Sequence, residues 1–119
     1  FNFRINPDNV YQLELWDGSA WISIVTQYVD WTTETWHHMV ATYNHSTYTV
    51  KIYVDGVEAI VDNSTVTAAP KSGNLWIGGH HQNEYFNGII DEVSIYDEVL
   101  SAAAIWDLYF HGPIPTPTP

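Results

Sequence analysis

Apolar and polar residues alternate with a period of two over much of the chain, a pattern that predicts β-strands. Polar or glycine-containing breaks separate these stretches, as expected for turns between antiparallel strands. After residue 96 the alternation stops, and Ser101 can cap a short helix in which Ile105, Leu108 and Tyr109 share one face. The pattern therefore predicts an all-β antiparallel sandwich with one short C-terminal helix. The predicted strands cover residues 1–5, 11–16, 21–24, 36–43, 48–54, 57–61, 75–77 and 89–96.

The loop at residues 17–20 sets the register of the first predicted hairpin. A tryptophan stands on either side of this loop, and with the two tryptophans opposite each other every inward-facing pair is aliphatic. Both indoles are then left together on the outer face. The predicted pairs are Trp16 with Trp21, Leu15 with Ile22, and Leu13 with Ile24.

Asp55 and Gly56 predict a second hairpin, because the dipeptide Asp-Gly fits the positive φ angles of a type I′ turn. The strand before it, residues 36–43, is apolar on both faces near Met39, which predicts a central position in its sheet. The pairs predicted for the hairpin are Val54 with Val57, Ile52 with Ala59 and Val50 with Val61 on an apolar face, and Tyr53 with Glu58 and Thr49 with Asp62 on the reverse.

The last predicted strand places one carboxylate in line with the core. Within residues 89–96, Asp91 alternates in phase with Ile89, Val93 and Ile95. An ionised carboxylate that is buried without a partner costs several kcal/mol. Asp91 is therefore expected either to bind a cation or to accept hydrogen bonds from backbone amides, and the residues alone leave both alternatives open.

Three motifs, in this order, resemble those of laminin G-like domains, which are concanavalin A-like jelly rolls. They are W-H-H-M-V-A-T-Y at 36–43, K-I-Y-V-D-G at 51–56, and G-I-I-D-E-V-S-I-Y-D-E-V-L-S followed by I-W-D-L-Y within 88–109. The resemblance implies a jelly-roll domain over residues 1–112, followed by a Pro/Thr linker or tail at 113–119. It also implies that Asp91 stands where many members hold a structural calcium with the help of backbone carbonyls, other ligands coming from an N-terminal part that is absent here.

Domains of this family begin several strands earlier than this chain does, so the resemblance implies that N-terminal strands are missing. An unpaired sheet edge is rarely left exposed. We therefore expect an outside strand to complete the sheet, from another copy or from a separate chain. If the first strand or the tail is donated in turn, the protein becomes the building block of a polymer. A truncated domain is the alternative explanation.

Composition limits the partners and the location. The chain has 14 acidic and 3 basic residues and a net charge of −11, which argues against nucleic acid as a partner, because phosphates require Lys and Arg. No apolar run approaches the length of a membrane span. Alternating Pro and Thr at 113–119 are typical of linkers between exported modules, so an extracellular or cell-surface location is expected. Asn44 and Asn63 match the N-glycosylation pattern.

The candidate chemistry is binding rather than catalysis. The sugar-cleaving members of the superfamily carry two glutamates and an aspartate alternating on one strand, and neither 14–17 nor 92–97 has that spacing. Trp16 and Trp21 are the candidate binding residues, because an outward indole pair can stack on sugar rings; alternatively, another subunit or missing strands cover it. His37 and His38, as neighbours on a strand, point to opposite faces and cannot readily share one zinc ion.

These features together predict a non-catalytic extracellular adhesion or assembly module. We expect copies of it to join by strand exchange into a homo-oligomer, filament or polymer. The alternative is a carbohydrate-binding module of a secreted multidomain protein, with glycans as its partners. The expected cofactor is a structural calcium ion or none.

Overall fold

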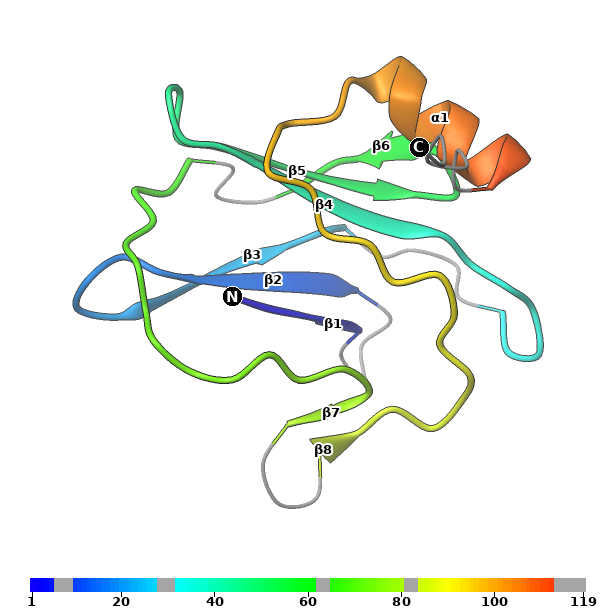
Figure 1. Ribbon diagram of the computed structural model, residues 1–119, viewed down its shortest axis with the longest axis horizontal. Coiled ribbons are helices and arrows are strands. Elements are labelled where there is room, and N and C mark those ends of the chain that lie inside the picture. Colours follow the sequence, from blue (N-terminus) through cyan, green and yellow to red (C-terminus); the bar gives the residue numbers. More distant parts are fainter. Residues whose placement is uncertain (6–9, 28–31, 62–64, 81–83, 113–119) are drawn as a thin grey trace, which may run out of the picture.

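The structure is a computed structural model that describes residues 1–5, 10–27, 32–61, 65–80 and 84–112. Within these residues the chain forms antiparallel strands and one C-terminal helix (Figure 1). One three-stranded sheet has the order β1-β2-β3, a second has the order β4-β5-β6, and β7 pairs with β8 in a small separate hairpin. The elements are β1 (Asn2–Ile5), β2 (Tyr11–Trp16), β3 (Trp21–Val25), β4 (Met39–Asn44), β5 (Thr49–Val54), β6 (Val57–Ala59), β7 (Gly79–His80), β8 (Glu84–Tyr85) and α1 (Ala102–His111).

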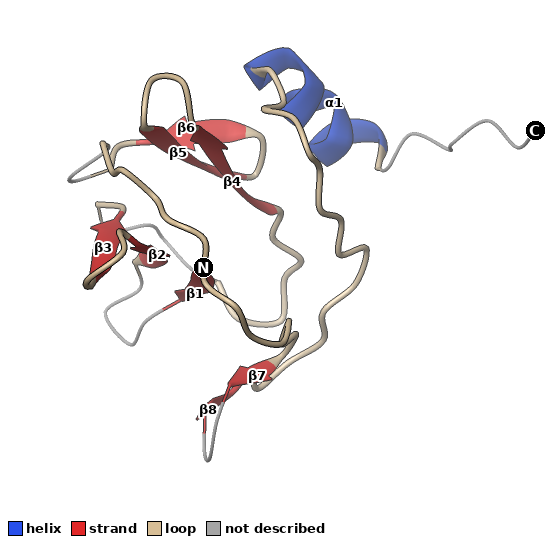
Figure 2. Ribbon diagram, turned by 60° about the vertical axis from the view of Figure 1, so that its left-hand side comes forward, coloured by secondary structure: helices blue, strands red, loops and turns tan. Residues whose placement is uncertain are grey.

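The two three-stranded sheets face each other and enclose the core (Figure 2). Ile24 of β3 and both Val50 and Ile52 of β5 are fully buried between them. Val66, on the chain that leaves the second sheet, packs into the same cluster. In β5 the buried Val50 and Ile52 flank the exposed Lys51, as the period of a strand requires. The predicted antiparallel β-sandwich with one short helix is confirmed.

The first hairpin has the predicted register. Trp16 lies opposite Trp21, Leu15 opposite Ile22 and Leu13 opposite Ile24. The aliphatic pairs point into the core, and the two indoles lie on the other face because successive side chains of a strand alternate.

The second hairpin has the predicted turn but only part of the predicted register. Asp55 and Gly56 have φ angles of 50° and 80°, as the turn requires, and the pairs from Val54–Val57 to Ile52–Ala59 form. The predicted pairing beyond Ala59 is wrong. The chain leaves β5 there: Val61 forms a bridge with Thr26 of the first sheet, and Thr49 forms one with Thr65. This departure connects the second sheet to the first; Asp62 lies outside the described residues.

Three other predictions about strands are wrong. Strand β4 lies at the border of its sheet, and its residues are half-buried rather than central. Residues 75–77 are exposed and form no strand, since the pairing is made just beyond them by β7 and β8. Residues 89–96 form no strand either: this segment leads from β8 to α1 along the outside of the sheets (Figures 1 and 2).

Local backbone chemistry interrupts the strand predicted at residues 89–96. Glu92 has a φ of 53°, which is incompatible with a β-ladder, and its backbone N–H donates to the Asp91 carboxylate at 2.8 Å. A short side chain that binds the neighbouring backbone competes with ladder hydrogen bonds. The alternating pattern is present, but no edge in the described residues pairs with it.

The helix begins where the sequence predicts. The Ser101 hydroxyl accepts a hydrogen bond from the Ala104 N–H at 3.1 Å, and Ile105 is fully buried. The helix packs on the Asp55–Gly56 turn: a Cβ added to Gly56 would lie 2.8 Å from Trp106 Cε3. Glycine therefore serves both the positive φ of the turn and the close approach of the helix.

Candidate functional site

Trp16 and Trp21 lie together on the outer face of the first sheet, as predicted. Trp16 ends β2, Trp21 begins β3, and the two form the last pair before the loop. Their ring centroids are 5.6 Å apart and their planes meet at 65°. Trp21 is 45% exposed, while Trp16 is half-buried. The pair therefore offers one open indole beside one that is partly covered.

A lysine from a distant loop covers Trp16. The Lys71 Nζ lies 3.9 Å from the centroid of the Trp16 ring and 5.5 Å from that of Trp21. The electron-rich face of an indole attracts an ammonium group, typically by about 0.5–1 kcal/mol at an exposed site. The same loop is held by its backbone, because the Ala69 N–H donates to the Trp16 carbonyl at 2.7 Å. The chain itself thus provides part of the cover of the tryptophan pair.

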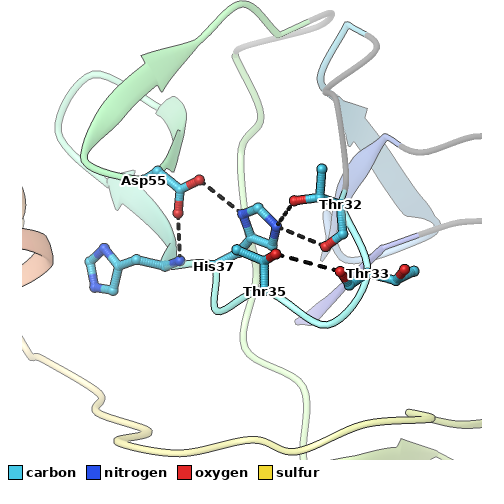
Figure 3. A network of polar contacts seen from close by, with 6 residues as sticks. Thr32, Thr33, Thr35, His37 and Asp55 are labelled. Atoms are coloured by element: carbon cyan, nitrogen blue, oxygen red, sulfur yellow. Dashed lines mark hydrogen bonds and ion pairs between the residues drawn. The ribbon is translucent and has the colours of Figure 1, made fainter.

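A second polar site joins the Asp55–Gly56 turn to the segment before β4 (Figure 3). The His37 Nδ1 lies 2.9 Å from Asp55 Oδ2, and the other carboxylate oxygen accepts the His38 N–H at 2.8 Å. On its far side, the His37 Nε2 lies 3.1 Å from the Thr32 carbonyl oxygen and 3.2 Å from the Thr32 hydroxyl. The His37 side chain is 8% exposed. The ring therefore bridges the hairpin turn and the loop at residue 32.

The contacts of His37 include those of a hydroxyl–imidazole–carboxylate relay, but their geometry does not favour base catalysis. In such a relay the Nε2 must keep a lone pair that receives the proton of the hydroxyl. Here the Nε2 also faces the Thr32 carbonyl oxygen, which can only accept. The ring lies between the Asp55 carboxylate and the Thr32 carbonyl oxygen, so the arrangement is suited to holding two segments together.

His38 is held differently from its neighbour. Its Nδ1 is buried without a hydrogen-bond partner among the described residues. Burial lowers the pKa of its ring below the usual range, and the negative charges of Asp55 and Glu92 oppose this shift. The ring lies 6.1 Å from that of Tyr109 on α1, centroid to centroid. His38 is thus a neutral packing residue, and His37 and His38 do point to different partners, as their adjacency predicts.

The structure does not bury Asp91, contrary to prediction. Its side chain is exposed and binds the neighbouring Glu92 N–H. Within the described ranges, no three His, Cys, Asp or Glu side chains converge in a way that could hold a metal ion. The burial cost that motivated a cation at Asp91 is therefore absent here, and calcium stays a prediction.

Of the two predicted glycosylation sites, Asn44 and Asn63, the structure describes only Asn44. Asn44 is the last residue of β4, rather than part of a loop, and its side-chain oxygen accepts the Ser46 N–H at 2.9 Å. Asn63 and residues 113–119 lie outside the described residues. Glycosylation at either asparagine stays a prediction. Among the described residues, no helix is long and apolar enough to cross a membrane.

Comparison with known proteins agrees with this architecture. No curated protein matches the chain. Among solved structures, the chain is similar to the 2.1 Å crystal structure of an S-layer domain-containing protein (residues 221–444) from Clostridium thermocellum ATCC 27405. The match has a TM-score of 0.58 and 19% identity, and covers 92% of this chain and 67% of the other, which supports the fold alone. A laminin G-type family model, described as the concanavalin A-like lectin/glucanases superfamily, matches residues 1–106. The chain therefore belongs to the concanavalin A-like lectin/glucanase superfamily.

Proposed function

We propose that this chain is a non-catalytic module of the cell surface or extracellular space that assembles with further copies of itself through residues 89–96. The observation that carries the proposal is the exposure of this segment. Ile89, Val93 and Ile95 are all more than half exposed, although they alternate as one face of a strand would. An apolar strand face that has no pairing partner in the described part of the chain is suited to strand addition.

The rest of the molecule supports binding over catalysis. The His37 ring is held between the Asp55 carboxylate and the Thr32 carbonyl oxygen, a geometry that ties two segments together. The superfamily includes both lectins and glucanases, so membership leaves either role open. The name of the similar S-layer domain-containing protein is in keeping with a location at the cell surface.

Exchanging Val93 for glutamate tests the assembly. Val93 is 52% exposed in the single chain, so the free module should tolerate Val93→Glu. In a paired strand, the same carboxylate would be buried without a partner, and we expect the dissociation constant to rise by at least about a hundredfold. Sedimentation velocity over a range of concentrations measures this constant.

Ser94→Glu is the matched control for this experiment. It adds the same charge one residue further on, where the side chain of a paired strand would point outward. We expect Ser94→Glu to assemble nearly as the wild type does. A wild-type chain that stays monomeric at every concentration would refute the proposal, as would a Val93→Glu chain that assembles unchanged.

Carbohydrate binding is a second candidate function, favoured by the open indole of Trp21. A sugar could stack on this ring, since aromatic faces bind apolar sugar faces and Trp21 is 45% exposed. Lys71 would compete for the neighbouring face of Trp16. If the pair binds glycans, Trp21→Ala should abolish binding on a glycan array, and Lys71→Met should preserve or strengthen it. Equal binding by wild type and Trp21→Ala would exclude this site.

A further inference from the structure

We infer that residues 89–96 of one copy pair with the border of β1 in a second copy, with Glu92 of the donated segment facing Arg4 of the acceptor. This inference rests on the proposed function and names the acceptor and the register of the assembly. It begins with a comparison of the borders of the two sheets. In the described residues these borders are β1 and β3 in the first sheet, and β4 and β6 in the second.

Charge distinguishes the four borders. The donor segment brings Asp91 and Glu92 and no basic residue. Strands β3 and β4 carry no charge, and β6 carries Glu58, whose carboxylate would repel the donor and already lies 3.1 Å from Lys51 Nζ. Strand β1 carries Arg4, whose side chain is 41% exposed and whose Nη2 lies 3.7 Å from Glu14 Oε1 of β2. The border of β1 is therefore the one of the four that brings a basic residue to an acidic strand.

The faces of β1 agree with this assignment. Phe3 and Ile5 pack against the core cluster, whereas Asn2 and Arg4 lie on the outer face, where they contact Glu14 and Gln12. In an antiparallel pairing with Glu92 opposite Arg4, Val93 lies opposite Phe3. Both members of each pair then point to the same face of the sheet.

The choice of face also minimises buried polarity in the donated segment. With Ile89, Val93 and Ile95 inward, Asp91 is the one polar residue on the core side, opposite Ile5, and the burial of its carboxylate is a cost of this pairing. The reverse orientation would turn both Glu92 and Ser94 toward the core. Pairing requires Glu92 to leave its φ of 53°, a conformation that is unfavourable for a residue with a Cβ. Strand addition thus relieves local strain where the segment is interrupted.

The proposed contact joins two different surfaces, so it is heterologous. The donor segment and the β1 border lie in different parts of the same chain, and each copy has one of each. Such contacts produce open chains of molecules unless the geometry closes into a ring or a reciprocal dimer. The inference therefore gives the assembly a direction, from the segment before α1 to the start of the sandwich.

Reversing the two charges separately and then mixing the variants tests the inference. In Arg4→Glu and in Glu92→Arg, each alone, the paired strands carry like charges, and we expect the dissociation constant to rise about fivefold or more at low salt. In an equimolar mixture, each donor meets an acceptor of opposite charge, so assembly should return to the wild-type level. Sedimentation velocity of the two variants and their mixture provides the measurement, and circular dichroism confirms that each variant is folded.

The outcomes separate this inference from the proposed function. Restoration on mixing supports the inference, because a pairing within one chain cannot be restored by a second chain. If Val93→Glu abolishes assembly but neither charge reversal weakens it, or if mixing does not restore it, β1 is not the acceptor and the proposed function still stands. If the wild type does not assemble at all, both fail.

Discussion

Replacing Gly56 by alanine is expected to lower the free energy of unfolding by about 3 kcal/mol, from two separate costs. Gly56 has a φ of 80°, where a side chain costs about 1 kcal/mol or more. An added Cβ would also lie 2.8 Å from Trp106 Cε3 and 3.0 Å from Tyr109 Cδ1. Forcing a methyl group into a packed contact typically costs a further 1–3 kcal/mol, roughly. Chemical denaturation monitored by tryptophan fluorescence measures the loss.

Gly78→Ala is the control that isolates the packing part. Gly78 has a similar φ of 77°, but among the described residues its added Cβ would meet only Ile90 Cδ1, at 3.6 Å, which is an ordinary contact. We expect Gly78→Ala to cost about 1 kcal/mol, from the backbone alone. Equal losses for the two variants would show that α1 does not pack on the turn as described. A second result would support the packing: Gly56→Ala should change the near-ultraviolet signal of the helix aromatics more than Gly78→Ala does.

The two hairpin turns could be predicted because neighbouring residues in the sequence determine them. An Asp-Gly dipeptide needs positive φ angles wherever it stands in a tight hairpin, and Asp55 and Gly56 adopt them. The register from Trp16–Trp21 inward follows from the loop and from the alternation of side chains. The cap at Ser101 is local in the same way. Each of these features depends on a few consecutive residues.

The features that the sequence could not predict depend on segments that are far apart along the chain. No residue near Lys71 in the sequence indicates that it covers Trp16. The one available signal is that the chain has only 3 basic residues, which makes each of them a candidate partner of an exposed indole. Similarly, the Asp-Gly dipeptide predicts the positive φ of Asp55 but not the hydrogen bond between its carboxylate and His37. Alternation at residues 89–96 predicts a strand that the structure does not form, because strand formation also needs a sheet border to pair with, which the pattern does not specify. The proposed assembly addresses that gap.

Besides forming the turn, Asp55 uses its carboxylate to hold the segment before β4. It accepts the backbone N–H of His38 at 2.8 Å, and it faces the His37 ring, which is largely buried. Asn also tolerates a positive φ, so Asp55→Asn keeps the backbone preference of the turn while removing the charge. The two partners contact different carboxylate oxygens, and an amide places an NH2 group where one of these oxygens was. We expect Asp55→Asn to lower the free energy of unfolding by about 2 kcal/mol, in line with the loss of a hydrogen bond to a charged group.

A double-mutant cycle with His37→Gln shows whether this loss arises from the His37 contact. If it does, Asp55→Asn should cost at least about 1 kcal/mol less in the His37→Gln chain than in the wild type, because the partner is already gone. Asp17→Asn is the comparison for an aspartate that only organises a turn. Its carboxylate accepts the Ala20 and Ser19 N–H groups, whose hydrogen bonds hold its pKa below the usual range, and the residue is partly exposed. Asp17→Asn should therefore lower the free energy of unfolding much less than Asp55→Asn does. If Asp55→Asn lowers the free energy of unfolding by the same amount in the His37→Gln chain, the His37 contact does not contribute to this loss. Other contacts would then hold the loop at residue 32 to the sandwich.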